Sequence, residues 1–108
     1  MNANNLFDGL PGELAEEHFT EILLAGGLRV ERIVSRGHCS PEGFWYDQDW
    51  AEWVLVLRGS AGVLFEGEAE PVVLRPGSYL SIPAHVRHRV AWTDSHEATV
   101  WLAIHYRA

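Results

Sequence analysis

Short runs of apolar residues, each four to nine positions long, follow one another along the second half of the chain. They are separated by Gly, Pro, Asp and Ser, which favour turns. The runs are dense in Val, Trp, Tyr and Leu, and no long helical period competes with them. They cover residues 52–57, 61–66, 72–75, 79–82, 86–92 and 98–106. Together with the runs upstream, this pattern predicts an all-β sandwich or barrel of seven or eight strands.

The first run is ambiguous between two kinds of element. The apolar residues of 13–24 fit one face of a helix, whereas residues 17–24 taken alone read as a strand rich in Phe, Thr and Ile. We predict the strand. Gly26 and Gly27 separate it from the alternating run 28–34, so the two runs are expected to form a hairpin.

The remaining segments complete a single domain over residues 1–108. Residues 1–12 are rich in turn residues and are expected to form an N-terminal arm. Residues 35–49 carry Gly and Pro and are expected to be a long irregular segment. One domain is expected because no repeat or linker divides the chain. The barrel core is expected to cover residues 28–106.

Composition narrows the classes of function. Eight Arg and no Lys stand against fifteen acidic residues, giving a net charge of −7, so affinity for nucleic acid is not expected. The longest apolar runs, 53–57 and 100–104, are too short to cross a membrane, and the first residues do not resemble a secretory signal. Cys39 is the only cysteine, so no disulfide forms within the chain. A soluble, cytoplasmic protein is expected.

Two spacings in residues 37–92 resemble the motifs of the cupin superfamily. The second cupin motif reads G-x5-P-x-G-x2-H-x3-N, and Gly77, Pro83 and His88 fall in its register. The first motif ends in E-x6-G, which Glu52 and Gly59 match. The resemblance implies a single cupin domain with an antiparallel jelly-roll β-barrel, the cupin double-stranded β-helix, and a pocket in its mouth.

The chain also departs from the cupin pattern. His85 replaces the Gly of the second motif and Trp92 replaces its final Asn. The paired histidines that should precede the motif Glu are absent. Their places hold Trp45 and Asp47, or Tyr46 and Gln48, depending on the loop length. The segment 43–48 is also similar to a branch of small single-domain cupins in which aromatic residues and Gln replace those histidines.

The cupin resemblance, together with strand alternation, gives the candidate site. Glu52 and His88 are the expected metal or ligand contacts, and Gln48 shares a face with Glu52 along an extended chain. Asp47 and His85 are weaker candidates. A mixed N/O site of this kind suits Zn, Fe, Mn or Ni, with modest affinity because an amide is a poorer donor than imidazole. The residues expected to line the pocket are Trp45, Tyr46 and Trp50.

Each candidate also has a purely structural explanation. Glu52 could form an ion pair with an Arg, His88 could hold a backbone carbonyl, and residues 47–49 could be a solvated loop tip. His18, His38, His96 and His105 lack partner spacing and are expected at the surface or in hydrogen bonds.

Two classes of function remain open from the sequence. One is a cupin that binds a divalent metal or a small molecule in its mouth, with isomerase, dioxygenase or hydrolase chemistry implied but not selected by the fold. The other is a metal-free ligand-binding or sensory module without catalysis. In either case we expect a homodimer, with the apolar N-terminal segment (Leu6, Phe7 and Leu10) docked on the neighbouring copy.

Overall fold

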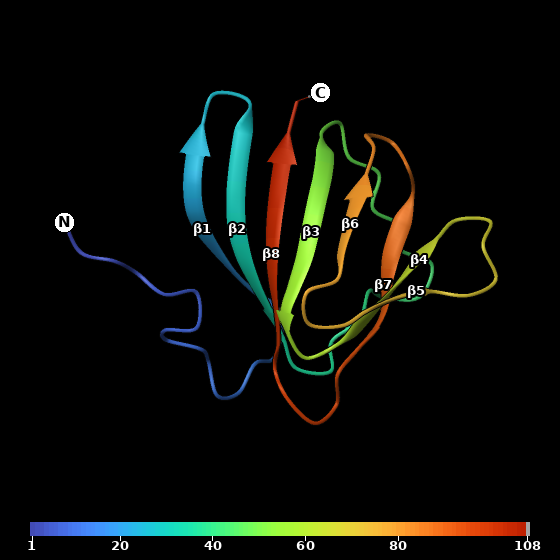
Figure 1. Ribbon diagram of the computed structural model, residues 1–108. Helices are drawn as coiled ribbons and strands as arrows, with labels where there is room; N and C mark the ends of the chain where they lie inside the picture. The colour runs from blue at the N-terminus through green and yellow to red at the C-terminus, as the bar shows by residue number, and fades with distance from the viewer. Residues whose placement is uncertain (108) are drawn as a thin grey trace.

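A computed structural model describes residues 1–107 as an all-β, antiparallel molecule of eight strands (Figure 1). The prediction of an all-β jelly-roll fold is confirmed, and so is the choice of a strand over a helix in the ambiguous first run. The strands are β1 (His18–Ala25), β2 (Leu28–Ser35), β3 (Ala51–Arg58), β4 (Ala61–Phe65), β5 (Val72–Leu74), β6 (Tyr79–Ile82), β7 (His88–Thr93) and β8 (Thr99–Tyr106).

The strands form two sheets. The larger has five strands in the order β1-β2-β8-β3-β6, and the smaller has three in the order β5-β4-β7. Strands β2 and β3 pair with opposite edges of β8 (Figure 1). The C-terminal strand therefore lies at the centre of the larger sheet.

The hydrophobic core lies between the two sheets. Its buried residues come from five strands, β3, β4, β5, β6 and β8: they are Val54, Val56, Ala61, Val63, Leu74, Ile82 and Trp101. On β3 the core residues Val54 and Val56 alternate with residues of the other face, and Glu52 continues their row. The inward-facing side chains of β3 therefore include two residues of the apolar core and the carboxylate of Glu52.

Gly59, which matches the end of the first motif, makes the tight turn from β3 to β4. Its φ is +78°, a conformation that favours glycine. A Cβ at this position would also lie 2.6 Å from Thr99 Oγ1 and 2.8 Å from the Ala98 carbonyl oxygen. Backbone conformation and close packing therefore both require glycine here.

The N-terminal arm is held on its own chain by arginines. Arg32 donates hydrogen bonds to the carbonyl oxygens of Leu6 (3.1 Å) and Asp8 (2.7 Å). The Arg58 guanidinium lies over the Phe7 ring, 4.5 Å from its centroid. The arm is thus attached near the ends of β2 and β3. Within residues 1–107, no helix has the length and apolar character to cross a membrane.

Candidate functional site

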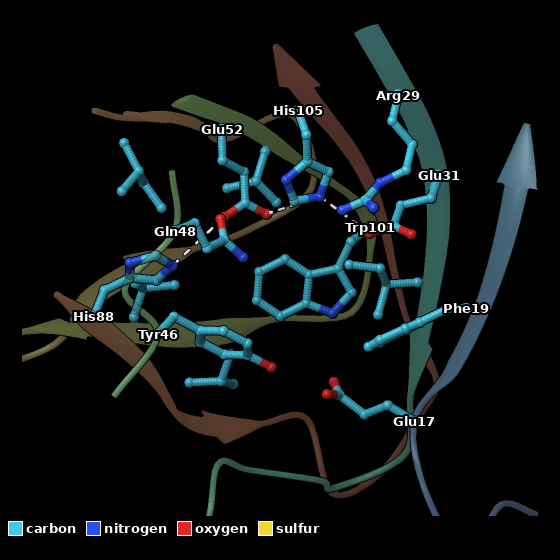
Figure 2. A pocket seen from close by; sticks show the side chains of 15 residues that line it. Glu17, Phe19, Arg29, Glu31, Tyr46, Gln48, Glu52, His88, Trp101 and His105 are labelled. Atoms are coloured by element: carbon cyan, nitrogen blue, oxygen red, sulfur yellow. Dashed lines mark hydrogen bonds and ion pairs between the residues drawn. The ribbon is translucent and has the colours of Figure 1, made fainter. Parts of the chain in front are cut away.

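A cavity of about 130 Å³ opens between the two sheets, next to the core. Its volume is several times what one buried water molecule requires, so a small polar molecule has room there. Figure 2 shows polar side chains from several strands directed into it. Its apolar wall includes Ile33, Val54, Val63, Ile82, Val90 and Trp101, and its polar side chains are Glu17, Arg29, Glu31, Tyr46, Gln48, Glu52, His88 and His105.

Glu52 and His105 form one wall of the cavity. They are direct partners in the β3–β8 ladder, so their side chains rise side by side from the same face. Glu52 is 8% exposed and His105 is 4% exposed. Glu52 Oε2 lies 3.8 Å from His105 Nε2. A buried carboxylate needs such a partner because desolvation of an unpaired charge is costly.

His88, the first residue of β7, approaches Glu52 from the smaller sheet. Its Nδ1 lies 2.9 Å from the Val86 carbonyl oxygen. A carbonyl only accepts, so Nδ1 carries a proton. Its Nε2 lies 3.5 Å from Glu52 Oε1. An unprotonated Nε2 and a carboxylate oxygen would repel each other at this distance. A proton or another cation is therefore needed between them.

The pKa of His88 follows from this geometry. Burial lowers it, but the hydrogen bond to Glu52, the Val86 carbonyl and the Glu52 charge together outweigh burial, and the net pKa is raised. The charged form of the ring is therefore favoured. Glu52 and His88 form the first carboxylate–imidazole pair of the cavity.

Glu31 and His105 form the second pair. His105 Nε2 donates to Glu31 Oε1 across 3.0 Å, from β8 to the neighbouring β2. The hydrogen bond from His105 lowers the pKa of Glu31 despite burial, with smaller contributions from the charges of His105 and Arg29. Because Glu52 also approaches His105, the two pairs form a continuous row, His88–Glu52–His105–Glu31 (Figure 2).

The loop between β2 and β3 supplies Tyr46 and Gln48. Tyr46 forms an isolated antiparallel bridge with His88, with N–H···O distances of 2.7 and 3.2 Å between the two backbones. The bridge makes this part of the loop extended, so Tyr46 and Gln48 point inward and Asp47 between them points outward. The Tyr46 ring stacks on His88 at 5.4 Å. Burial, followed by the charges of nearby carboxylates, raises the pKa of Tyr46.

Asp47 and His85 contact each other and are not among the residues that line the cavity. His85 Nδ1 lies 2.8 Å from Asp47 Oδ1, and His85 Nε2 lies 3.4 Å from Asp49 Oδ1, with both partners exposed. His85 stands at the glycine position of the second motif and has a φ of +64°. Its backbone N–H donates to the Gln48 carbonyl oxygen at 2.8 Å.

The predicted tryptophans lie at different depths. Trp45 is not among the residues that line the cavity, within the part of the chain that the structure describes. Trp50 lines a shallower depression beside the cavity mouth, together with Arg29 and Gln48. The Arg107 guanidinium covers the Trp50 ring at 5.0 Å. Of the three expected aromatic residues, Tyr46 lies in the cavity and Trp50 at its mouth.

His105 and Glu31 lie in the cavity although the sequence did not single them out. His105 was expected at the surface or in a hydrogen bond; it makes the hydrogen bond, but it is buried. Strand alternation could have pointed to them. His105 shares a face with Trp101 and Ala103 of its strand, and Glu31 shares a face with Arg29 and Ile33. Recognising that these faces meet requires the pairing of β2 with β8 and of β8 with β3.

The side chains around Glu52 offer both oxygen and nitrogen atoms as donors. Gln48 lies beside Glu52 and His88 (Figure 2), so one carboxylate, one imidazole and one amide converge. Within residues 1–107, no group of three or more His, Cys, Asp or Glu side chains is arranged to hold a metal ion. Catalytic zinc sites generally have three His, Cys or carboxylate ligands. An amide in place of one of them lowers the expected affinity.

Comparison with known proteins identifies the family. Residues 34–105 match the family model described as a cupin domain. The chain belongs to the cupin family. A cupin superfamily protein from Desulfitobacterium hafniense has the same fold, with a TM-score of 0.73 at 15% identity, covering 92% of this chain and 84% of that one.

Two relatives with higher sequence identity have isomerase names. A putative mannose-6-phosphate isomerase from Ralstonia eutropha is 52% identical, with a TM-score of 0.96 and full coverage of both chains. A glucose-6-phosphate isomerase from Pyrococcus horikoshii is 32% identical over 89 residues, which are 80% of this chain. The cupin described here spans 44% of the length of that second relative.

Proposed function

We propose that this cupin binds a phosphorylated sugar in its cavity and catalyses aldose–ketose isomerisation. The observation that carries the proposal is the row of two carboxylate–imidazole pairs, Glu52–His88 and Glu31–His105, in one small cavity. The isomerase names of the relatives support this reaction class and the phosphorylated substrate. Such pairs are suited to moving protons between neighbouring atoms.

The two pairs divide the proton transfers that the reaction needs. We assign the carbon-bound proton to His105, oriented by Glu31. Because His105 Nε2 donates its proton to Glu31, Nδ1 is the nitrogen that takes the carbon-bound proton. When this proton leaves the carbon next to the carbonyl, the C–H electron pair forms the double bond of an enediol. The carbonyl oxygen takes its proton from His88, whose raised pKa keeps a proton available. In the second half of the reaction, His105 gives its proton to the neighbouring carbon while His88 takes the proton from the hydroxyl of the carbon that was deprotonated first, so the carbonyl has moved and both rings are regenerated.

Arg29 is the proposed contact for the phosphate. Among the residues that line the cavity and the depression at its mouth, it is the one Arg or Lys in the described chain. It is exposed at the rim, where a phosphate can stay hydrated while the sugar enters. A guanidinium binds phosphate through paired hydrogen bonds. Replacing Arg29 with Gln should raise KM for phosphorylated sugars without a matching change for unphosphorylated ones.

Glu52, His88 and Gln48 are the residues proposed to hold a divalent cation such as Zn, Fe, Mn or Ni. When bound, such a cation polarises the substrate carbonyl. With a cation bound, His88 Nε2 would carry no proton, and the cation instead of His88 would stabilise the negative charge on the carbonyl oxygen. His105, oriented by Glu31, takes the carbon-bound proton whether or not the cation is bound.

The test is conversion of sugar phosphates in D₂O. Mannose, glucose and fructose 6-phosphates are incubated with the protein and either EDTA or one of the four cations, then freed of the cation and examined by proton NMR. We expect interconversion with deuterium entering at C1 or C2, and a loss of about 10²-fold or more in rate for His105→Asn. Asp47→Asn, outside the cavity, is the matched control and should retain the parent rate. Absence of both conversion and exchange under every condition would overturn the proposal.

The second candidate function is a metal-free binding module. It is favoured by the absence of a three-residue His, Cys, Asp or Glu group for a metal among residues 1–107. Calorimetric binding of a sugar phosphate in EDTA, with no deuterium exchange, would select this function.

A further inference from the structure

Glu17 lines the cavity, and the proposed reaction gives it no role. It lies just before β1, where His18 pairs with Val34 in the β1–β2 ladder, so Glu17 stands opposite Ser35 at the end of β2. Figure 2 shows the Glu17 carboxylate directed into the cavity from the side opposite His105. The cavity therefore has a carboxylate on the wall that faces the row of carboxylate–imidazole pairs.

Two hydrogen bonds in series hold one oxygen of this carboxylate. The Trp101 indole Nε1–H donates to Ser35 Oγ at 3.1 Å, and an indole nitrogen can only donate. The single proton of the Ser35 hydroxyl is therefore donated to Glu17 Oε2. Ser35 is 0% exposed and Trp101 is 4% exposed, so water does not compete for these bonds. Glu17 Oε2 is thus fixed in place as an acceptor.

The second oxygen of Glu17 is left for a ligand. Within residues 1–107, Ser35 is the hydrogen-bond donor to the Glu17 side chain, and it binds Oε2. Oε1 therefore needs a donor from a ligand or from water. A hydroxyl group supplies such a donor, whereas the carboxylate repels a phosphate. Arg29 and Ser35 lie at opposite ends of the inward face of β2, so the two charges separate the phosphate from the hydroxyls of a sugar phosphate.

Tyr46 adds a donor to the same wall. Burial, and after it the charge of Glu17, raises the pKa of Tyr46, so the carboxylate is close enough to oppose ionisation of the phenol. The phenol O–H can donate while the Glu17 oxygen accepts. A sugar hydroxyl between the two groups can therefore both accept and donate a hydrogen bond.

We propose that Glu17 and Tyr46 bind the hydroxyl on C3 or C4 of the sugar, the carbons between the reacting C1–C2 end and the phosphate. This inference rests on the proposed function, which places the reacting carbons at His88 and His105 and the phosphate at Arg29. Glu17 is then a specificity-determining residue. A sugar without the matching hydroxyl leaves a carboxylate oxygen in the cavity without a donor, which weakens binding.

The test compares glucose 6-phosphate with its 3-deoxy and 4-deoxy analogues, each of which lacks one of the two hydroxyls. Calorimetric titration in EDTA measures the three dissociation constants. We expect one analogue to bind the parent at least about tenfold more weakly than glucose 6-phosphate, because a hydrogen bond to a charged group is lost. In Glu17→Ala that analogue and glucose 6-phosphate should bind equally tightly. Glu16→Gln, which changes the exposed neighbouring carboxylate, is the matched control and should keep the parent's difference.

Glu17→Gln provides the test if Glu17→Ala does not fold. Its amide oxygen can accept the Ser35 proton, so the bonds among Ser35, Trp101 and residue 17 are kept, while a neutral amide group faces the cavity. The difference between the two sugars should fall to about threefold or less, since a neutral hydrogen bond is weaker than a charged one.

The outcomes separate this inference from the proposed reaction. A parent that isomerises sugar phosphates but binds all three sugars equally would overturn the role of Glu17 alone. So would a difference between the sugars that both Glu17 variants retain. A parent that shows the expected difference, but neither conversion nor deuterium exchange, would overturn the isomerisation alone.

Discussion

A carboxylate within an apolar strand is costly unless it has partners, and Glu52 has two. His88 and His105 approach its two oxygens from opposite sides, at 3.5 and 3.8 Å. The spacing from Glu52 to Gly59 and from Pro83 to His88 predicted that Glu52 and His88 lie in the mouth of the barrel, and both line the cavity. It could not indicate His105, which reaches Glu52 only through strand pairing.

The first prediction at this scale concerns the metal. Gln48→His replaces a neutral amide oxygen beside Glu52 and His88 with an imidazole nitrogen, the better donor for Zn and Ni. We expect it to bind these ions at least tenfold more tightly than the parent does, and His88→Ala to lose binding. Calorimetric titration with Zn, Ni and Mn measures both effects. If His88→Ala binds as well as the parent, the ligand set is wrong.

The second prediction concerns Glu31 and pH. Its pKa is lowered in the folded protein, chiefly by the hydrogen bond from His105. This interaction therefore stabilises the fold above the ordinary pKa of about 4.5, and the stabilisation is lost as the pH falls through the lowered value. Glu31→Gln should be less stable than the parent at pH 7, with a difference that shrinks below about pH 4.5. Urea unfolding from pH 7 to 3 measures it; a difference that does not change with pH would contradict this account.

At the scale of elements, the strands were predictable and the loops between them were not. Alternation and turn residues determine a strand locally, so the predicted run 79–82 is β6 as found. The segment 35–49 has no such period, and the sequence left Asp47 and Gln48 as alternatives. The bridge between Tyr46 and His88 decides which of them faces inward, and that contact joins residues 42 positions apart.

The turn between β6 and β7 gives the third prediction. His85 has a φ of +64°, which costs a residue with a Cβ about 1–2 kcal/mol. His85→Gly and His85→Ala both remove the ion pairs with Asp47 and Asp49, but only Gly relieves the backbone. We expect His85→Gly to be about 1 kcal/mol more stable than His85→Ala. Chemical denaturation of the two variants measures this, and equal stability would show that the turn is not strained.

At the scale of the whole molecule, the two faces of the larger sheet have different surroundings. The inward face of β3 and β8 supplies both the core and the cavity, and their outward face is apolar without a covering layer. The five-residue apolar runs in the sequence anticipate strands covered on both sides. They do not reveal which side is covered by the smaller sheet, because that depends on the arrangement of all eight strands.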